Sequence, residues 1–194
     1  RLAQQVREKD DAINQMELDI DQDCLRILAR RQPAASDLRL VVSISKIIVD
    51  LERIGDESSK IAKRALDLVE EGQAPRGYVE CRHIGHHVRR MVQEALDAFA
   101  RMDTEQAFAV AREDKAVDQE YKTAMREMVT FMMEDPRSIG RVLNILWVLR
   151  SLERVGDHAR NIAEHVIYLV KGTDVRHIGL KRMEAEVKKD GADE

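Results

Sequence analysis

The sequence predicts an all-α protein built as tandem three-helix bundles. Only 4% of its residues are aromatic and only three are proline. Ala, Leu, Val, Ile, Met, Glu, Lys and Arg dominate, without clusters of strand-forming residues, which is typical of helical proteins. Apolar residues recur at alternating steps of three and four, the spacing of helices with one buried face. Similar motifs also occur twice in the same order, which indicates a duplicated helical unit.

A proline separates the first two predicted helices. Pro33 cannot continue a helix, and Ser36 with Asp37 are residue types that cap a helix start. The stretch from Glu71 to Gly77, with two glycines and one proline, is predicted to be the inter-domain linker. These signals predict helices over residues 1–31 and 36–71.

The second half holds three predicted helices. Asp103 followed by Gln106 forms a capping-box pattern, so one helix ends before Asp103 and another begins there. Pro136 and Ser138 mark the next boundary, and Gly172 suits the left-handed cap that ends a helix. These signals predict helices over residues 78–102, 104–134 and 138–171. From Lys181 onward the chain is polar, and we expect it to be loosely held.

Two motifs recur across the halves. "DLERIGDESSKIAKRA" from Asp50 matches "SLERVGDHARNIAEHV" from Ser151, and "EKDDAIN" from Glu8 matches "REDKAVD" from Arg112. The second pair follows the helix 78–102, and the first pair has no such predecessor. Because two long helices leave an apolar face uncovered, we expect the leading helix of the first bundle to be missing from this sequence. The predicted units are residues 1–72 (first repeat), 76–172 (second bundle) and 173–194 (polar C-terminal tail).

Each Glu-Arg-x-Gly-Asp motif places its glycine in an apolar seam. The second seam comprises Ile145, Leu149, Leu152, Gly156, Ala159, Ala163, Val166 and Val170, and the first comprises Ile44, Ile48, Leu51, Gly55, Ser58, Ala62, Ala65 and Val69. A glycine inside a helix costs about 1 kcal/mol relative to alanine. We therefore expect both glycines to let a neighbouring helix approach closely.

Oxygen-bearing side chains collect beside each seam. Residues four apart on a helix point the same way, so each motif presents its glutamate and aspartate together. If the preceding helix packs antiparallel, its own polar residues meet them. The two predicted clusters are Glu153, Asp157, Asp114 and Asp118 in the second repeat, and Glu52, Asp56, Asp10 and Asn14 in the first.

Such clusters repel themselves unless a positive charge intervenes. Arg53 and Arg154, inside the motifs, are one source of that charge, as ordinary ion pairs. Hard cations such as Mg²⁺, Mn²⁺ or iron are the other, since they favour all-oxygen ligands. Spacing leaves both interpretations open. Repetition of the acids together with glycine favours metal, although gene duplication alone would also copy them.

Composition excludes several classes of function. The net charge of −4 and the pI of about 5.9 argue against nucleic-acid binding, which needs a basic face. No apolar run approaches the roughly 20 residues of a spanning helix, so we expect a soluble protein without membrane insertion. Cys24 and Cys81 are read as reduced thiols of a cytoplasmic protein.

No catalytic constellation appears, so the sequence does not predict an enzyme. It contains no glycine-rich phosphate loop and no Cys-x-x-Cys pair. Glu80, His83, His86 and His87 include a Glu-x-x-His spacing. Di-iron bundles need that spacing on two helices. We therefore read these residues as a surface cluster and disfavour a ferritin-like oxidoreductase.

Several of these segments together resemble the PhoU family of regulators of phosphate-specific transport. They are the two Glu-Arg-(Ile/Val)-Gly-Asp motifs, "ARRQPAASDLRLVVSISKI" from Ala29, "REDKAVDQEY" and "HARNIAEHVIYLVKG". The resemblance spans about residues 8–179. It implies tandem three-helix bundles, and metal ions, iron clusters in some members, bound at the repeated acidic motifs. Asn14 stands where the second repeat has Asp118, so we expect the first site to bind metal more weakly.

The resemblance also implies a role. It points to negative control of the phosphate-starvation response, through contacts with the ATPase subunit of a phosphate transporter and with a sensor histidine kinase. Apolar residues left over on the fifth helix, Trp147 and Val148, favour a homodimer. One hypothesis joins metal to phosphate: bound cations offer open coordination positions to an anion that bare carboxylates repel.

Overall fold

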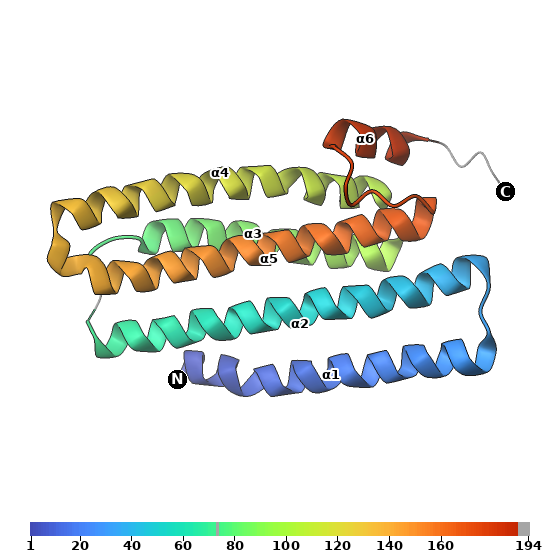
Figure 1. Ribbon diagram of the computed structural model, residues 1–194, viewed down its shortest axis with the longest axis horizontal. Helices are drawn as coiled ribbons and strands as arrows, with labels where there is room; N and C mark the ends of the chain where they lie inside the picture. The colour runs from blue at the N-terminus through green and yellow to red at the C-terminus, as the bar shows by residue number, and fades with distance from the viewer. Residues whose placement is uncertain (73, 190–194) are drawn as a thin grey trace.

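The computed structural model describes residues 1–72 and 74–189 of the chain (Figure 1). It confirms the all-α class, since no strand occurs among these residues. The elements are α1 (Leu2–Arg31), α2 (Ala35–Glu70), α3 (Tyr78–Arg101), α4 (Thr104–Glu134), a 3-10 turn (Pro136–Ser138), α5 (Ile139–Lys171) and α6 (Leu180–Lys188). The five long helices begin and end within one residue of the predicted positions.

The five long helices lie roughly side by side along the longest axis of the molecule (Figure 1). α3, α4 and α5 pack against one another as a three-helix bundle, and α2 packs against the outer side of α5. α1 packs against α2, and in the described part of the chain it contacts no other helix. The prediction that a further helix precedes α1 stays a prediction.

Burial differs sharply between the two repeats. The α3–α4–α5 bundle holds most of the buried apolar side chains, and every predicted seam residue of α5 is buried except Val170. The seam of α2 is less buried, and Val69 is 79% exposed. Between α1 and α2 an open apolar groove of about 470 Å³ contains Ile13, Met16 and Leu51.

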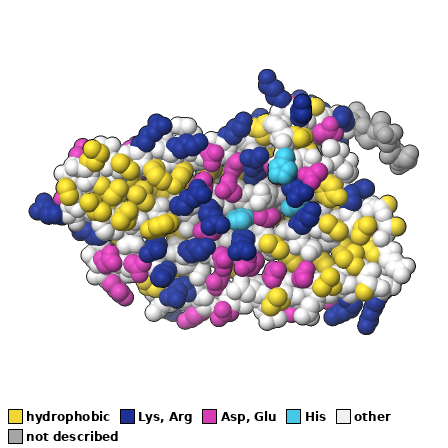
Figure 2. Space-filling view, in the orientation of Figure 1, with side chains coloured by type: hydrophobic (Ala, Val, Ile, Leu, Met, Phe, Trp, Pro, Cys, Tyr) yellow, Lys and Arg dark blue, Asp and Glu magenta, His cyan; other side chains and the backbone are white. Residues whose placement is uncertain are grey.

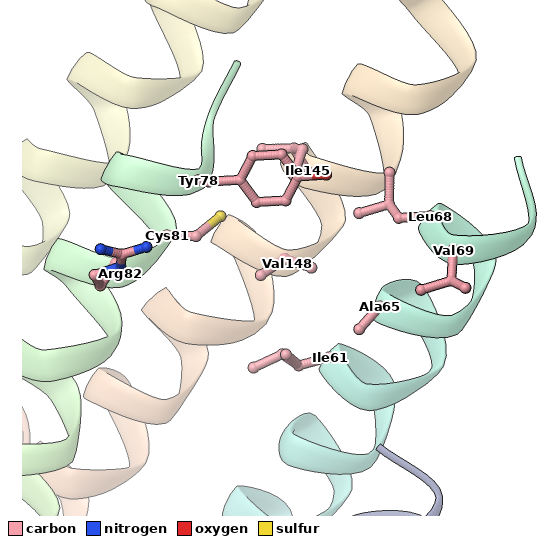
Figure 3. Close-up of a pocket in the computed structure, with 9 residues that line it drawn as sticks. All are labelled: Ile61, Ala65, Leu68, Val69, Tyr78, Cys81, Arg82, Ile145 and Val148. Carbon is pink, nitrogen blue, oxygen red and sulfur yellow. The ribbon is translucent and has the colours of Figure 1, made fainter. Parts of the chain in front are cut away.

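A second apolar groove, of about 530 Å³, lies where the two repeats join (Figure 3). Ile61 and Leu68 of α2 face Tyr78 and Cys81 of α3, with α5 between the two helices. Burial raises the pKa of the Cys81 thiol to about 12, so it stays protonated at neutral pH. Both cysteines are free, as expected.

Some local predictions hold and others need correction. The Asp103 side chain accepts a hydrogen bond from the Gln106 backbone N–H at 2.9 Å, and Gly172 ends α5 with a φ of 74°, both as predicted. Ser36 does not cap α2, because that helix starts one residue earlier with Ala34 as its N-cap. Gln73, inside the predicted linker, lies outside the described residues.

The prediction that the chain is loosely held from Lys181 onward needs correction, because part of this segment is an ordered helix. Residues 180–188 form α6, which packs on α4 and buries Met183 and Val187. The two residues are four apart, so a single apolar face suffices to anchor this polar helix. Residues 190–194 lie outside the described range. Among the described residues, none of the helices combines the length and apolar character needed to cross a membrane.

Candidate metal centre

The second acidic cluster converges between α4 and α5. Asp118 of α4 and Glu153 and Asp157 of α5 each offer a carboxylate oxygen, and these atoms lie within 4.8 Å of one another. We call these three residues the acidic triad. Elsewhere in the described part of the chain, no other three His, Cys, Asp or Glu side chains meet this closely.

The triad is only partly neutralised by protein groups. Glu153 Oε1 accepts a hydrogen bond from Arg150 Nη1 at 2.6 Å, whereas Glu153 Oε2 is buried and has no hydrogen-bond partner. Burial, followed by repulsion from Asp157, raises the pKa of Glu153. Burial, followed by repulsion from Asp114 and Asp118, raises the pKa of Asp157. The metal-free cluster is therefore a concentration of negative charge that favours proton uptake.

Asp114, the fourth predicted ligand, lies beside the triad with a partner of its own. Its Oδ2 accepts a hydrogen bond from Arg160 Nη1 at 3.1 Å, and its side chain is almost fully buried. Burial raises the pKa of Asp114, and the hydrogen bond from Arg160 opposes that shift. Asp114 thus adds charge near the triad while its nearest cation is a guanidinium.

Arg154 does not neutralise the acids of its own motif. Its Nη1 lies 2.9 Å from Glu57 Oε1 on α2, so it joins the two repeats instead. The arginines that serve the second cluster are Arg150 and Arg160, which sequence reasoning missed. Arg150 was detectable, because it precedes Glu153 by three residues on the same helix. Arg160 was not, because its pairing with Asp114 depends on how α4 packs against α5.

The first cluster is wider and more open. Asp10 Oδ1 and Asn14 Oδ1 are buried on α1 without a hydrogen-bond partner. On α2, burial, followed by repulsion from Asp56, raises the pKa of Glu52. Arg53 lies 3.5 Å from Glu52 and 3.7 Å from Asp56, and is itself 53% exposed. Arg53 therefore pairs with the acids of its own motif, as one of the two interpretations expects, but through long and solvent-exposed contacts.

The donor sets of both clusters fit a hard cation. All of their ligand atoms are oxygens, and each cluster contains at least one buried oxygen without a hydrogen-bond partner, two in the first and one in the second. A Mg²⁺ ion with bonds of about 2.1 Å separates opposed oxygens by about 4.2 Å, so the triad needs only small side-chain movements to enclose one. The wider first cluster requires larger movements or bridging water.

The two motif glycines lie in the seams as predicted, with different surroundings. A Cβ added to Gly55 would come within 3.2 Å of Ile13 and 3.5 Å of Asp10 Oδ1. A Cβ added to Gly156 would lie 3.4 Å from Val117, an ordinary van der Waals contact. The predicted close helix approach is therefore tight at Gly55, and Gly156 has room for a methyl group.

The histidine cluster of α3 engages α4. His87 Nδ1 lies 3.1 Å from Glu120, its Nε2 lies 3.2 Å from Glu113, and His83 Nε2 lies 3.5 Å from Glu120. The two carboxylates were not predicted from the sequence. They come from α4 without a second Glu-x-x-His helix, so the ferritin-like alternative gains no support.

Comparisons with known proteins agree with this architecture. The PhoU domain family matches residues 1–65 and 81–166. The phosphate-specific transport system accessory protein PhoU homolog of Pseudomonas aeruginosa is 74% identical over 186 residues, which cover 96% of this chain and 77% of that protein. The Escherichia coli phosphate-specific transport system accessory protein PhoU is 50% identical over 178 residues, with 92% and 73% covered.

Solved structures show the same fold. The crystal structure of PhoU from Pseudomonas aeruginosa superposes with a TM-score of 0.87, covering 89% of this chain and 82% of that one. The phosphate transport system regulatory protein PhoU from Streptococcus pneumoniae, at 35% identity, superposes with a TM-score of 0.81, covering 89% and 81%. The relatives are named as accessory or regulatory proteins rather than enzymes, as expected from the sequence. Its repeated motifs, helical architecture and high identity to these proteins establish that the chain belongs to the PhoU domain family.

Proposed function

We propose that the chain is a cytoplasmic adaptor that limits phosphate uptake and represses the phosphate-starvation two-component response when phosphate is plentiful. Its partners are the ATPase subunit of a phosphate transporter and a sensor histidine kinase. One observation carries the proposal: the 74% identical relative is named as an accessory protein of the phosphate-specific transport system. Five long helices expose extended side faces, which suits simultaneous contact with two partners.

A pull-down tests the adaptor role. The chain, immobilised at high and at low phosphate, is presented with the purified transporter ATPase and with the cytoplasmic part of the sensor kinase. We expect both partners to be retained, and more of the kinase at high phosphate. Retention of neither partner at any phosphate concentration contradicts the adaptor role.

The proposal includes metal ions at the two acidic clusters. Asp118, Glu153 and Asp157 hold a cation in the second repeat, and Glu52, Asp56, Asp10 and Asn14 hold a weaker one in the first. Mg²⁺, Mn²⁺ and iron suit these oxygen donors. The cation supplies positive charge where acidic side chains converge. The protein positions those side chains on antiparallel helices and shields them from solvent.

A purely structural role for the acids is the second candidate. The Arg150–Glu153 hydrogen bond at 2.6 Å favours it, because a guanidinium already neutralises one ligand. Elemental analysis of the purified chain separates the two, with a Glu153→Ala/Asp157→Ala double variant as the control. We expect bound metal in the parent protein and less of it in the double variant. Equal metal content in the two proteins supports the structural role.

A homodimer completes the proposal. Trp147 is 56% exposed and Leu143, one turn earlier, is 43% exposed. Figure 2 shows hydrophobic side chains gathered at both ends of one face of the molecule. Sedimentation velocity tests this point, and Trp147→Glu is expected to shift the protein toward the monomer. A parent protein that sediments as a monomer contradicts it.

A further inference from the structure

A polar pocket of about 360 Å³ lies beside the acidic triad, on the face of α5 next to α2. In Figure 2, basic, acidic and histidine side chains gather in the middle of the visible face, between the two hydrophobic regions. Three arginines line the pocket: Arg154 and Arg160 of α5, and Arg176 from the segment that follows that helix. Three guanidinium groups around one small pocket are typical of a site for a multiply charged oxyanion.

Carboxylates outside the pocket fix two of these arginines. Arg154 Nη1 lies 2.9 Å from Glu57 Oε1, and Glu57 is buried on α2. Arg176 Nε donates to Asp174 Oδ1 at 3.0 Å. A guanidinium has five N–H donors, and one carboxylate engages only part of them. Both arginines are thus oriented in advance and retain N–H groups for a ligand.

Arg160 also lines the pocket and is held by two carboxylates. Its Nε donates to Glu164 Oε1 at 2.9 Å and its Nη1 donates to Asp114 Oδ2 at 3.1 Å. These two hydrogen bonds occupy two of its five N–H groups. Glu164 also lines the pocket and is 3% exposed, so a buried carboxylate lies beside the three guanidinium groups.

His158 and Asn161 also line the pocket. His158 Nδ1 lies 2.8 Å from Asp50 Oδ1, and Asn161 Nδ2 donates to the same oxygen at 3.1 Å. Asp50 belongs to α2 and is itself buried. Both repeats therefore hold the pocket in shape, through Asp50 and through Glu57.

We infer that this pocket binds inorganic phosphate directly, with Arg154, Arg160 and Arg176 on its oxygens and Glu164 accepting the hydrogen bond of its P–OH group. The carboxylate gives the site its selectivity. Hydrogen phosphate carries a hydroxyl group, whereas sulfate and the dianion of a phosphomonoester carry none and present only acceptors to Glu164. A site built to pair with a ligand hydroxyl rejects analogues that lack it, because its buried acceptor is left facing negative charge.

The pocket also shares a wall with the acidic triad. Asp157 belongs to both. A cation at the triad cancels negative charge at the pocket's edge, so phosphate affinity rises when the triad is loaded. This coupling rests on the proposed metal binding, whereas the arginine pocket itself does not.

Isothermal titration of the full chain tests the inference. Inorganic phosphate, sulfate and phosphoserine are titrated at about pH 8, where all three carry dianionic groups, with and without Mg²⁺. We expect phosphate to bind at least about tenfold more tightly than either analogue, and more tightly with Mg²⁺. Arg176→Gln is expected to weaken phosphate binding about tenfold, because it removes a charge-assisted hydrogen bond. Glu164→Gln is expected to reduce the difference in affinity between phosphate and sulfate.

Arg137→Gln is the matched control. Arg137 also pairs with an aspartate two residues earlier, Asp135, but it is 92% exposed and does not line this pocket. Phosphate that binds Arg176→Gln as tightly as Arg137→Gln overturns the inference, and so does equal affinity for sulfate. If Mg²⁺ binds and phosphate does not, the phosphate pocket is overturned and the proposed metal site stands. Phosphate binding without Mg²⁺ binding supports the pocket and contradicts the metal part of the proposed function.

Discussion

The two Glu-Arg-x-Gly-Asp repeats have the same pattern of residues in different surroundings. α5 is enclosed by α2, α3 and α4, and its seam is buried from Ile145 to Val166. α2 has α1 on one side and α5 on the other, and its seam ends in exposed residues. The side chain of Glu153 is 11% exposed, and that of its counterpart Glu52 is 22% exposed.

This difference shows that packing around a motif, rather than the motif itself, sets its electrostatics. In the second repeat a short contact from Arg150 and close approach of three carboxylates concentrate the charge. In the first repeat the arginine contacts are longer and the groove is open. Charge that is withdrawn from water interacts more strongly, both with its neighbours and with any cation that binds. The second repeat is therefore the stronger candidate for tight metal binding.

The largest difference between the repeats is expected when a seam side chain is truncated to alanine and the free energy of unfolding is compared. Ile145 and Ile44 occupy matching seam positions, but Ile145 is 2% exposed and Ile44 is only partly buried. Ile145→Ala is expected to lower the free energy of unfolding by about 2–5 kcal/mol, because a fully enclosed side chain leaves a cavity. Ile44→Ala is expected to cost less than half as much. Urea unfolding of both variants measures this, and equal losses would mean that the two seams are equally enclosed.

An exchange of ligands between the repeats gives the next largest effect. Asn14→Asp gives the first cluster the carboxylate that Asp118 supplies in the second, and Asp118→Asn removes it there. Each change is expected to alter Mn²⁺ affinity at its own site by about tenfold, or about 1.4 kcal/mol, up in the first case and down in the second. Calorimetric titration of both single variants and of the double variant measures the sites separately. Unchanged affinity in Asp118→Asn contradicts the assignment of the triad.

The pH dependence follows from the raised pKa values of Glu153 and Asp157. In the unfolded chain these carboxyls titrate at ordinary values, so at pH values between the unfolded and folded pKa the folded state binds more protons. Lowering the pH through that window stabilises the metal-free protein, by at most about 1.4 kcal/mol per pH unit and group. The same protonation displaces metal, because cations need ionised carboxylates.

Thermal unfolding with and without Mg²⁺ measures both effects. The stabilisation by Mg²⁺ is expected to be larger at neutral pH than at about pH 5. Glu153→Gln/Asp157→Asn is expected to remove most of this pH dependence, whereas the matched Glu52→Gln/Asp56→Asn variant is expected to retain it. If both double variants behave alike, the buried triad does not differ from the open cluster.

Much of the fold was predictable because its signals are local. Pro33, Asp103, Pro136 and Gly172 sit at helix boundaries, and each acts through its own backbone or cap. Periodicity identified the seams, since one helix face repeats every three or four residues. α6 was missed because a short polar helix with two buried residues, Met183 and Val187, gives little periodic signal.

The candidate site was predictable only in part. The pairing of acids four apart, such as Glu153 and Asp157, is a property of one helix, and the facing acids followed from the repeat. The arginines beside these acids depend on how the helices pack, so the pairing of Arg160 with Asp114 was not predicted. Arg154 was one of two open sources of charge for its own motif, and it pairs with Glu57 of α2 instead. The arginine pocket could not be predicted from the sequence for the same reason. Arg176 belongs to the segment after Gly172, beyond the end of α5, so its place beside Arg154 and Arg160 depends on how that segment folds.

The smallest difference between the repeats is expected at their glycines. Alanine has a higher helix propensity than glycine by about 1 kcal/mol, so Gly→Ala stabilises a helix wherever the added methyl group fits. At Gly156 the methyl group meets Val117 at an ordinary contact distance, and Gly156→Ala is expected to raise the free energy of unfolding by up to about 1 kcal/mol. At Gly55 it meets Ile13 at 3.2 Å, so part of that gain is lost in moving Ile13. Thermal unfolding in the absence of metal measures both variants, and a destabilised Gly156→Ala would show that the second seam is as tight as the first.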